Sequence, residues 1–108
     1  MALWNRLKQE LDRAGHVAQG ALDEGRVRLD AFRAKQLADK AAQALGWAVY
    51  RARQRGQELD VEIYARLSST IAGHEAEAAR LEQQIDAMAA ARRARRPAAS
   101  HPGHPPAA

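Results

Sequence analysis

Few side chains in this 108-residue chain could do chemistry, and their spacing matches no catalytic arrangement. The chain has no cysteine, which excludes a thiolate nucleophile, a disulfide and a cysteine zinc site. His74 precedes Glu75, but no second histidine follows one helical turn later, as a helical zinc motif requires. Thr70 is the hydroxyl that helical spacing brings near His74, and nothing else supports a catalytic pair. We therefore expect no enzymatic activity, no cofactor, no metal and no small-molecule substrate.

The positive charge of the chain is concentrated near its C-terminus. Residues 1–91 hold 13 basic and 13 acidic side chains, so the formal net charge of +4 belongs to the residues that follow. The basic cluster consists of Arg92, Arg93, Arg95 and Arg96. Cations at a helix C-terminus complement the helix dipole, and they also suit weak, salt-sensitive contact with lipid or nucleic-acid phosphate. No aromatic residues are interleaved with the cluster, so we expect no specific nucleic-acid recognition. His101 and His104 are too few to predict a metal site.

Composition indicates helices rather than a thick globular core. Ala, Glu, Lys, Leu and Arg account for 60 residues, whereas Leu, Ile, Val and Phe together number 18. All four prolines follow position 96, so the preceding residues are free to be helical. We predict an all-α fold with an N-terminal amphipathic helix over 1–26 and an antiparallel helical hairpin, a coiled coil, over 27–95. The turn is expected near 55–60, and residues 96–108 are expected to form a disordered, basic and proline-rich tail.

The second arm of the expected hairpin carries the clearest periodicity. The seam residues, spaced alternately four and three apart, are Leu67, Ile71, His74, Ala78, Leu81, Ile85 and Met88. This is a heptad pattern, and a two-helix hairpin alone buries little apolar area. We expect the seam to mediate self-association, with a dimer favoured; packing of the N-terminal helix on the hairpin is the alternative. His74 would either fix the register of the seam or act as a pH switch.

The first arm of the expected hairpin, residues 27–55, has a wider and more alanine-rich stripe. Its members are Ala34, Leu37, Ala41, Leu45, Ala48, Val49 and Ala52. Gly56 suits the end of this helix and Asp60 suits the N-cap of the next, which spans 60–94. Trp47 and Tyr50 share another side of the same helix. They either pack against the N-terminal helix or a second subunit, or form an exposed hot spot for an unknown protein partner.

The first residues of the chain are typical of a helix that needs a surface to lie on. The apolar positions Leu3, Leu7, Leu11, Ala14, Ala18 and Leu22 form a helical stripe, and Trp4 lies beside its start. Gly15, Gly20 and Gly25 are expected to interrupt this helix, since each costs up to about 1 kcal/mol relative to alanine. The surface could be the hairpin, another subunit or a membrane. In the last case Leu3, Trp4, Leu7 and Leu11 would contact lipid, with Arg6 and Lys8 at the polar edge.

Two short motifs are similar to those of known families. The opening Trp4-Asn-Arg-Leu-Lys-Gln-Glu-Leu and the motif Leu45-Gly-Trp-Ala-Val-Tyr50 resemble those of small bacterial coiled-coil proteins of uncharacterised function, over about residues 1–90. Some of those proteins end in a cysteine zinc ribbon, which this chain lacks. The opening also resembles, at Leu3, Trp4, Arg6 and Leu7, the membrane-sensing first helix of phage-shock-type proteins. The hairpin is much shorter than that family needs, and neither resemblance implies catalytic residues.

Together these patterns predict a non-enzymatic helical interaction or scaffolding module that self-associates through the seam. A peripheral binder of an anionic membrane surface, using the N-terminal helix, is the alternative. Non-specific nucleic-acid binding through the arginine-rich tail is the second alternative. The first residues contain no signal-peptide core, so we expect a cytoplasmic protein, peripheral at the inner membrane face if the membrane hypothesis holds.

Overall fold

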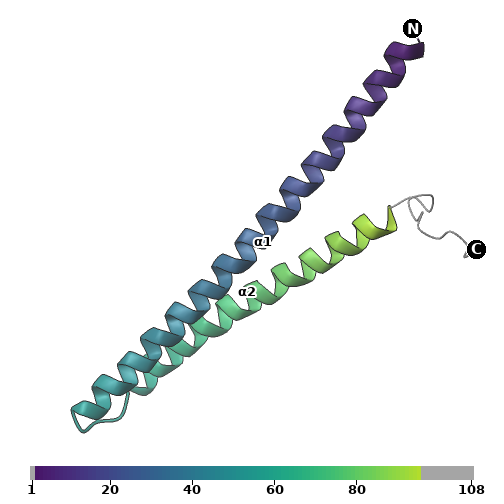
Figure 1. Cartoon of the computed structure of the whole chain (residues 1–108). Helices are drawn as coiled ribbons and strands as arrows, with labels where there is room; N and C mark the ends of the chain where they lie inside the picture. Colours follow the sequence, from purple (N-terminus) through teal and green to yellow (C-terminus); the bar gives the residue numbers. More distant parts are fainter. Residues whose placement is uncertain (1, 96–108) are drawn as a thin grey trace, which may run out of the picture.

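The protein folds as a two-helix hairpin in the computed structural model, which describes residues 2–95 (Figure 1). Helix α1 spans Ala2–Gln54 and helix α2 spans Val61–Ala94. Figure 1 shows α1 running straight along the molecule while α2 folds back beside it and diverges from it toward the chain ends. The longest dimension, 80 Å, matches the length of a 53-residue helix at about 1.5 Å per residue. The prediction of an all-α hairpin is confirmed for the described residues.

Local capping signals set the turn, as the sequence predicted. The amide of Gln57 donates to the carbonyl of Ala52, and the amide of Gly56 donates to the carbonyl of Arg53, both at 2.9 Å. This is a Schellman motif, and Gly56 takes the left-handed conformation that the motif requires, with φ of 71°. The carboxylate of Asp60 then accepts from the amide of Glu62 at 2.7 Å and caps α2. The chain therefore reverses within a few residues and aligns the helices antiparallel.

The face of α1 that packs on α2 is built from alanine. The four buried residues of α1 are Ala31, Ala34, Ala38 and Ala52, and the half-buried ones are Glu24, Val27, Ala41, Leu45 and Ala48. These positions alternate in steps of three and four, which is the heptad spacing of a coiled coil. The sequence prediction was wrong in part: Leu37 and Val49 are exposed, and Ala31 and Ala38 take the inward places. Small side chains let the helices approach closely, so the larger residues lie outside the contact.

The seam of α2 faces α1 of the same chain. Ala78 and Leu81 are buried, and Leu67, Ile71, His74, Ile85 and Met88 are half-buried. Ala78 and Leu81 form a small core with Ala31 and Ala34, and Val27 and Ile85 pack against it. The heptad positions, predicted as the seam of self-association, thus pack on α1. Their contact in this chain is intramolecular, so any self-association needs a further surface.

The expected boundary between residues 26 and 27 is absent, because α1 is one helix from Ala2 to Gln54. Gly15, Gly20 and Gly25 do not interrupt it. Once a helix is nucleated, each further residue adds a hydrogen bond, and the alanine- and leucine-rich surroundings offset the cost of three isolated glycines. Where the two helices pack side by side, Arg92 near the end of α2 forms a salt bridge with Glu24, so the end of α2 is level with about residue 22 of α1. Residues 2–20 therefore extend beyond the end of α2, and we call this segment the overhang.

Candidate functional site at the open end of the hairpin

The overhang presents apolar side chains that no other part of the described chain covers. Leu3, Trp4, Leu7 and Leu11 are all exposed, at 79%, 60%, 46% and 63%. Every residue from 2 to 23 is exposed, so the N-terminal segment does not pack on the hairpin. The N-terminal helix was expected to lie on the hairpin, on another subunit or on a membrane, and the structure excludes the hairpin of the same chain. The overhang is about 28 Å long at 1.5 Å per residue, and a second subunit and a membrane stay the two remaining hypotheses for what its apolar stripe contacts.

The antiparallel arrangement places the basic cluster at the same end of the molecule as the overhang. Arg92 and Arg93 lie in the last turn of α2, and Arg95 is its C-cap residue. Arg96 lies outside the described residues, as do His101 and His104. Across 2–28 and 88–95 there are eight basic and four acidic side chains, whereas 29–87 hold eight basic and nine acidic ones. The open end is thus the positively charged part of an otherwise balanced body.

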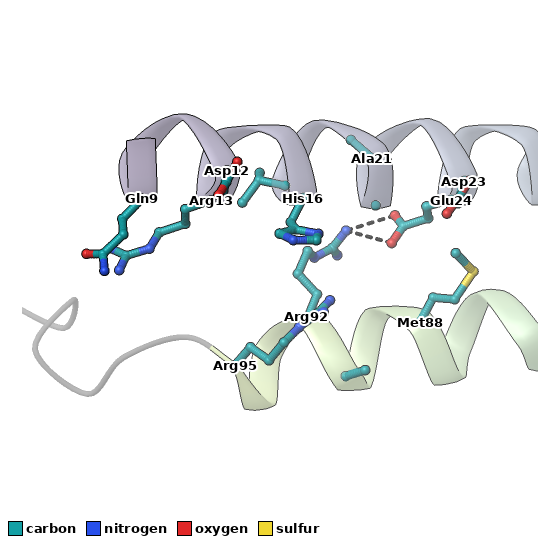
Figure 2. A pocket seen from close by; sticks show the side chains of 13 residues that line it. Gln9, Asp12, Arg13, His16, Ala21, Asp23, Glu24, Met88, Arg92 and Arg95 are labelled. Carbon is teal, nitrogen blue, oxygen red and sulfur yellow. Dashed lines mark hydrogen bonds and ion pairs between the residues drawn. The ribbon is translucent and has the colours of Figure 1, made fainter. Parts of the chain in front are cut away.

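A charged clasp joins the two helices at the start of the open end. Both carboxylate oxygens of Glu24 accept hydrogen bonds from Nη1 of Arg92 at 2.8 Å (Figure 2). Nη2 of Arg28 lies 3.2 Å from Oε2 of the same side chain. The Glu24 side chain is only 14% exposed. The hydrogen bonds from Arg92 are the main reason that the pKa of Glu24 lies below its usual value, and Arg28 adds to the effect. The clasp therefore holds α2 against α1 while Glu24 is ionised.

Beyond the clasp the diverging helices enclose an open groove of about 1330 Å³. Gly20, Ala21 and Ala91 supply its small walls, and its other lining residues are Gln9, Asp12, Arg13, His16, Val17, Asp23, Glu24, Met88, Arg92 and Arg95. In Figure 2, Arg13 and His16 extend from α1 toward the end of α2, and Arg92 reaches across to Glu24. Three arginines and three carboxylates line the groove together with apolar side chains, so the groove itself carries no net charge.

The structure does not bring Thr70 and His74 together as a hydrogen-bonded pair. The hydroxyl of Thr70 donates to the carbonyl of Arg66 at 3.0 Å, a local bond within α2, while His74 lies half-buried in the seam. Within 2–95 no group of three or more His, Asp or Glu side chains could hold a metal ion. The part of the chain that the structure describes also contains no helix apolar and long enough to cross a bilayer. The absence of enzymatic activity stays a prediction.

The aromatic pair lies at the other end of α1, near the turn. The rings of Trp47 and Tyr50 meet edge to face with centroids 5.8 Å apart, and the guanidinium of Arg51 lies 5.7 Å from the Trp47 ring. The hydroxyl of Tyr50 accepts from Gln54 at 2.8 Å. Both rings remain exposed, at 58% and 52%. The pair is therefore held in place on one helix and is not covered by the N-terminal segment.

Sequence reasoning missed the clasp. The sequence assigned no role to Glu24, and Arg92 was predicted only as one member of the basic cluster. The heptad spacing of Val27, Ala31 and Ala34 was the available signal, because it extends back to position 24 and places an acid in the contact face. Comparison of the chain with protein-family models, with curated proteins and with solved structures found no match.

Proposed function

We propose that the protein binds the surface of an anionic membrane through the open end of its hairpin. The observation that carries this proposal is the position of the overhang: four large apolar residues project beyond the hairpin from the end that also carries the basic cluster. Stable attachment to a bilayer surface generally needs two signals, such as an inserted apolar face and a polybasic patch. Here the antiparallel fold brings both signals to one end of the molecule.

The energetic contributions of the two signals are of similar size. Removing the exposed parts of Leu3, Trp4, Leu7 and Leu11 from water contributes about 1 kcal/mol each, since full burial of such a side chain gives about 1.5–3 kcal/mol. A Lys or Arg near an anionic leaflet adds about 1 kcal/mol. Arg93 and Arg95 are exposed and free of the Glu24 clasp, and Arg6 and Lys8 flank the apolar stripe. Tryptophan favours the headgroup boundary, which suits Trp4 at the tip of the overhang.

The test is co-flotation of the full chain with vesicles of phosphatidylcholine, with and without phosphatidylglycerol. Trp4→Ala should weaken binding several-fold while leaving the thermal unfolding midpoint nearly unchanged, because Trp4 is exposed in the hairpin. Tyr64→Ala is the matched control, since Tyr64 is 54% exposed but lies near the turn. In a Trp47→Phe background, the fluorescence of Trp4 should shift to the blue on addition of anionic vesicles. Equal binding by the Trp4→Ala and Tyr64→Ala variants would refute the proposal.

The basic cluster is tested separately by salt and substitution. Arg93→Gln with Arg95→Gln should reduce binding to anionic vesicles and make the remaining binding less sensitive to salt, because fewer cations face the lipid phosphates. These two arginines are chosen because neither takes part in the clasp. If the unsubstituted chain binds duplex DNA and the double variant loses DNA binding to the same extent as vesicle binding, the second alternative, non-specific nucleic-acid binding by the cluster, would be favoured instead.

The interaction-module hypothesis remains as a second candidate function. It is supported by exposed apolar and aromatic residues on α1 that lie outside the open end, among them Phe32, Trp47 and Tyr50. A surface of this composition is typical of protein–protein contacts. The contact face predicted for self-association, the seam, is already packed on α1, so the candidate surface moves to the outer side of the hairpin.

A further inference from the structure

In the hairpin body, the side of helix α1 opposite the face that packs on α2 carries large apolar side chains toward its two ends, with Gln36, Asp39 and Gln43 between them. A helix turns by about 100° per residue, so a residue two places before a contact residue lies about 200° away from it. Three large residues lie two places before a buried alanine of the contact face. They are Leu29 before Ala31, Phe32 before Ala34 and Tyr50 before Ala52. Leu29, Phe32, Trp47 and Tyr50 are 48–58% exposed. We call this side of residues 22–54 the outer face of α1.

The outer face of α2 has the opposite character. The positions two places before its contact residues Ile71, Ala78 and Ile85 are Ser69, Ala76 and Gln83, all exposed. The exposed neighbours on the same side are mostly small: Ala65, Ala72, Ala79, Ala87 and Ala90. A large-residue face on α1 thus lies on one side of the hairpin, and a small-residue face on α2 lies on the other.

The contact inside the hairpin already shows how such faces pack. There, alanines of α1 receive Leu81 and Ile85 of α2, which is a small face against a large one. The two outer faces repeat this combination with the roles of the helices exchanged. The outer face of α1 from one chain therefore matches, in side-chain size, the outer face of α2 from a second chain.

Charge favours the same pairing over contact between two α1 faces. On the outer faces, α1 carries Arg26, Arg33 and Lys40 against Asp39, whereas Asp86 and Arg80 of α2 balance each other. Two α1 faces would therefore bring like charges together, and an α1 face on α2 would not. Salt bridges inside the hairpin place Lys35 level with Glu82. If a second chain keeps that register, Arg33 comes close to the level of Asp86, and Asp39 comes close to the level of Arg80.

Two glycines support the same register. In the register that pairs Lys35 with Glu82, Gly46 on the outer face of α1 is level with Ile71, close to Gly73 on the outer face of α2, and a Cβ at either glycine would meet nothing within 4 Å. Neither glycine is needed for packing inside the hairpin. A close approach of helices from two chains at this level is a use for both.

We propose that the outer face of α1 binds the outer face of α2 of a second copy of this chain. This inference is independent of membrane binding, which uses the overhang and the basic cluster. Each chain would use a different face for each neighbour, so the contact is heterologous and does not close on itself. The average mass should therefore rise steadily with concentration above the 11.8 kDa of one chain instead of stopping at a dimer.

The test is a charge exchange in the full chain, followed by sedimentation equilibrium over a concentration series. Arg33→Asp and Asp86→Arg should each weaken association by about tenfold or more, because each places like charges opposite one another. An equimolar mixture of the two variants should regain the mass of the unsubstituted chain, since the two altered faces fit each other and so do the two unaltered faces. Both residues are exposed, so helicity and the unfolding midpoint should stay unchanged and serve as the folding control.

Lys8→Asp is the matched control, because it makes the same charge change in the overhang and should leave the mass unaltered. A chain that is monomeric at all concentrations would overturn the proposal, and so would a mass that stops at two chains. An Asp86→Arg variant that associates normally would do the same, since it would assign the contact to two α1 faces. Loss of anionic-vesicle binding by Arg33→Asp without any change in mass would assign the outer face of α1 to lipid.

Discussion

The identity of the inward face of α1 can be tested by one pair of substitutions. Ala38 is 8% exposed on the face that packs on α2, and its neighbour Leu37 is 47% exposed. In Ala38→Leu, three additional carbon atoms must enter a contact that small side chains hold close, which costs about 1–3 kcal/mol. For a domain of this size that lowers the unfolding midpoint by about 5–20 °C. In Leu37→Ala, the unfolding free energy should change by only about 0.5 kcal/mol.

The assay is thermal and urea unfolding followed by circular dichroism at low protein concentration, so that association between chains does not contribute. Ala44→Leu is the matched control, because Ala44 is exposed on the same helix and the substitution adds the same atoms. It should leave the unfolding free energy nearly unchanged. A larger loss of stability in Leu37→Ala than in Ala38→Leu would show that the large residues face inward, and would refute the alanine contact.

Three further predictions concern the clasp, a helical glycine and the turn. Hydrogen bonds from Arg92 lower the pKa of Glu24, so the stabilisation is present at neutral pH and is lost as the pH falls through that lowered pKa. Glu24→Gln should therefore be less stable than the unsubstituted chain at pH 7, and the difference should shrink as the pH falls below the usual range of a glutamate, measured by thermal unfolding; a constant difference would contradict this linkage. Gly15→Ala should raise the unfolding free energy by about 0.5–1 kcal/mol in urea titrations, because an added Cβ meets nothing within 4 Å. Gly56→Ala should lower it by about 1 kcal/mol, since Gly56 has a φ of 71°, and an unchanged midpoint would argue against the turn geometry.

The parts of the fold that the sequence predicted are those controlled by local chemistry. Gly56 and Asp60 carry capping signals that depend on only a few neighbouring residues, and both act as predicted. The heptad of α2 was equally clear, because large residues such as Leu81 and Ile85 stand out from charged neighbours. Its partner was not determined by the pattern, since a heptad face packs equally well on the same chain or on another.

The inward face of α1 was harder to predict because size and burial are reversed there. Sequence reasoning assigns large apolar residues such as Leu37 to the contact, but here Ala31 and Ala38 take those places. The sequence also predicted wrongly that the N-terminal helix ends near residue 26, and the reason is different. Three isolated glycines indicate a weak helix without fixing a break, and the cooperative growth of α1 carries it through all of them.

The sequence of α1 combines two periods, and the difference between them explains where the hairpin opens. From Val27 to Ala52 the contact residues repeat every seven positions, which corresponds to about 3.5 residues per turn and requires a partner to wind around. From Leu3 to Leu22 the apolar stripe advances in steps of four, four, three, four and four, close to the 3.67 residues per turn of an 11-residue repeat. A helix with that spacing keeps its stripe nearly straight. Residues 2–20 therefore suit a flat surface better than a left-handed coiled coil, which is a physical reason to propose a membrane for the overhang and another chain for the hairpin body.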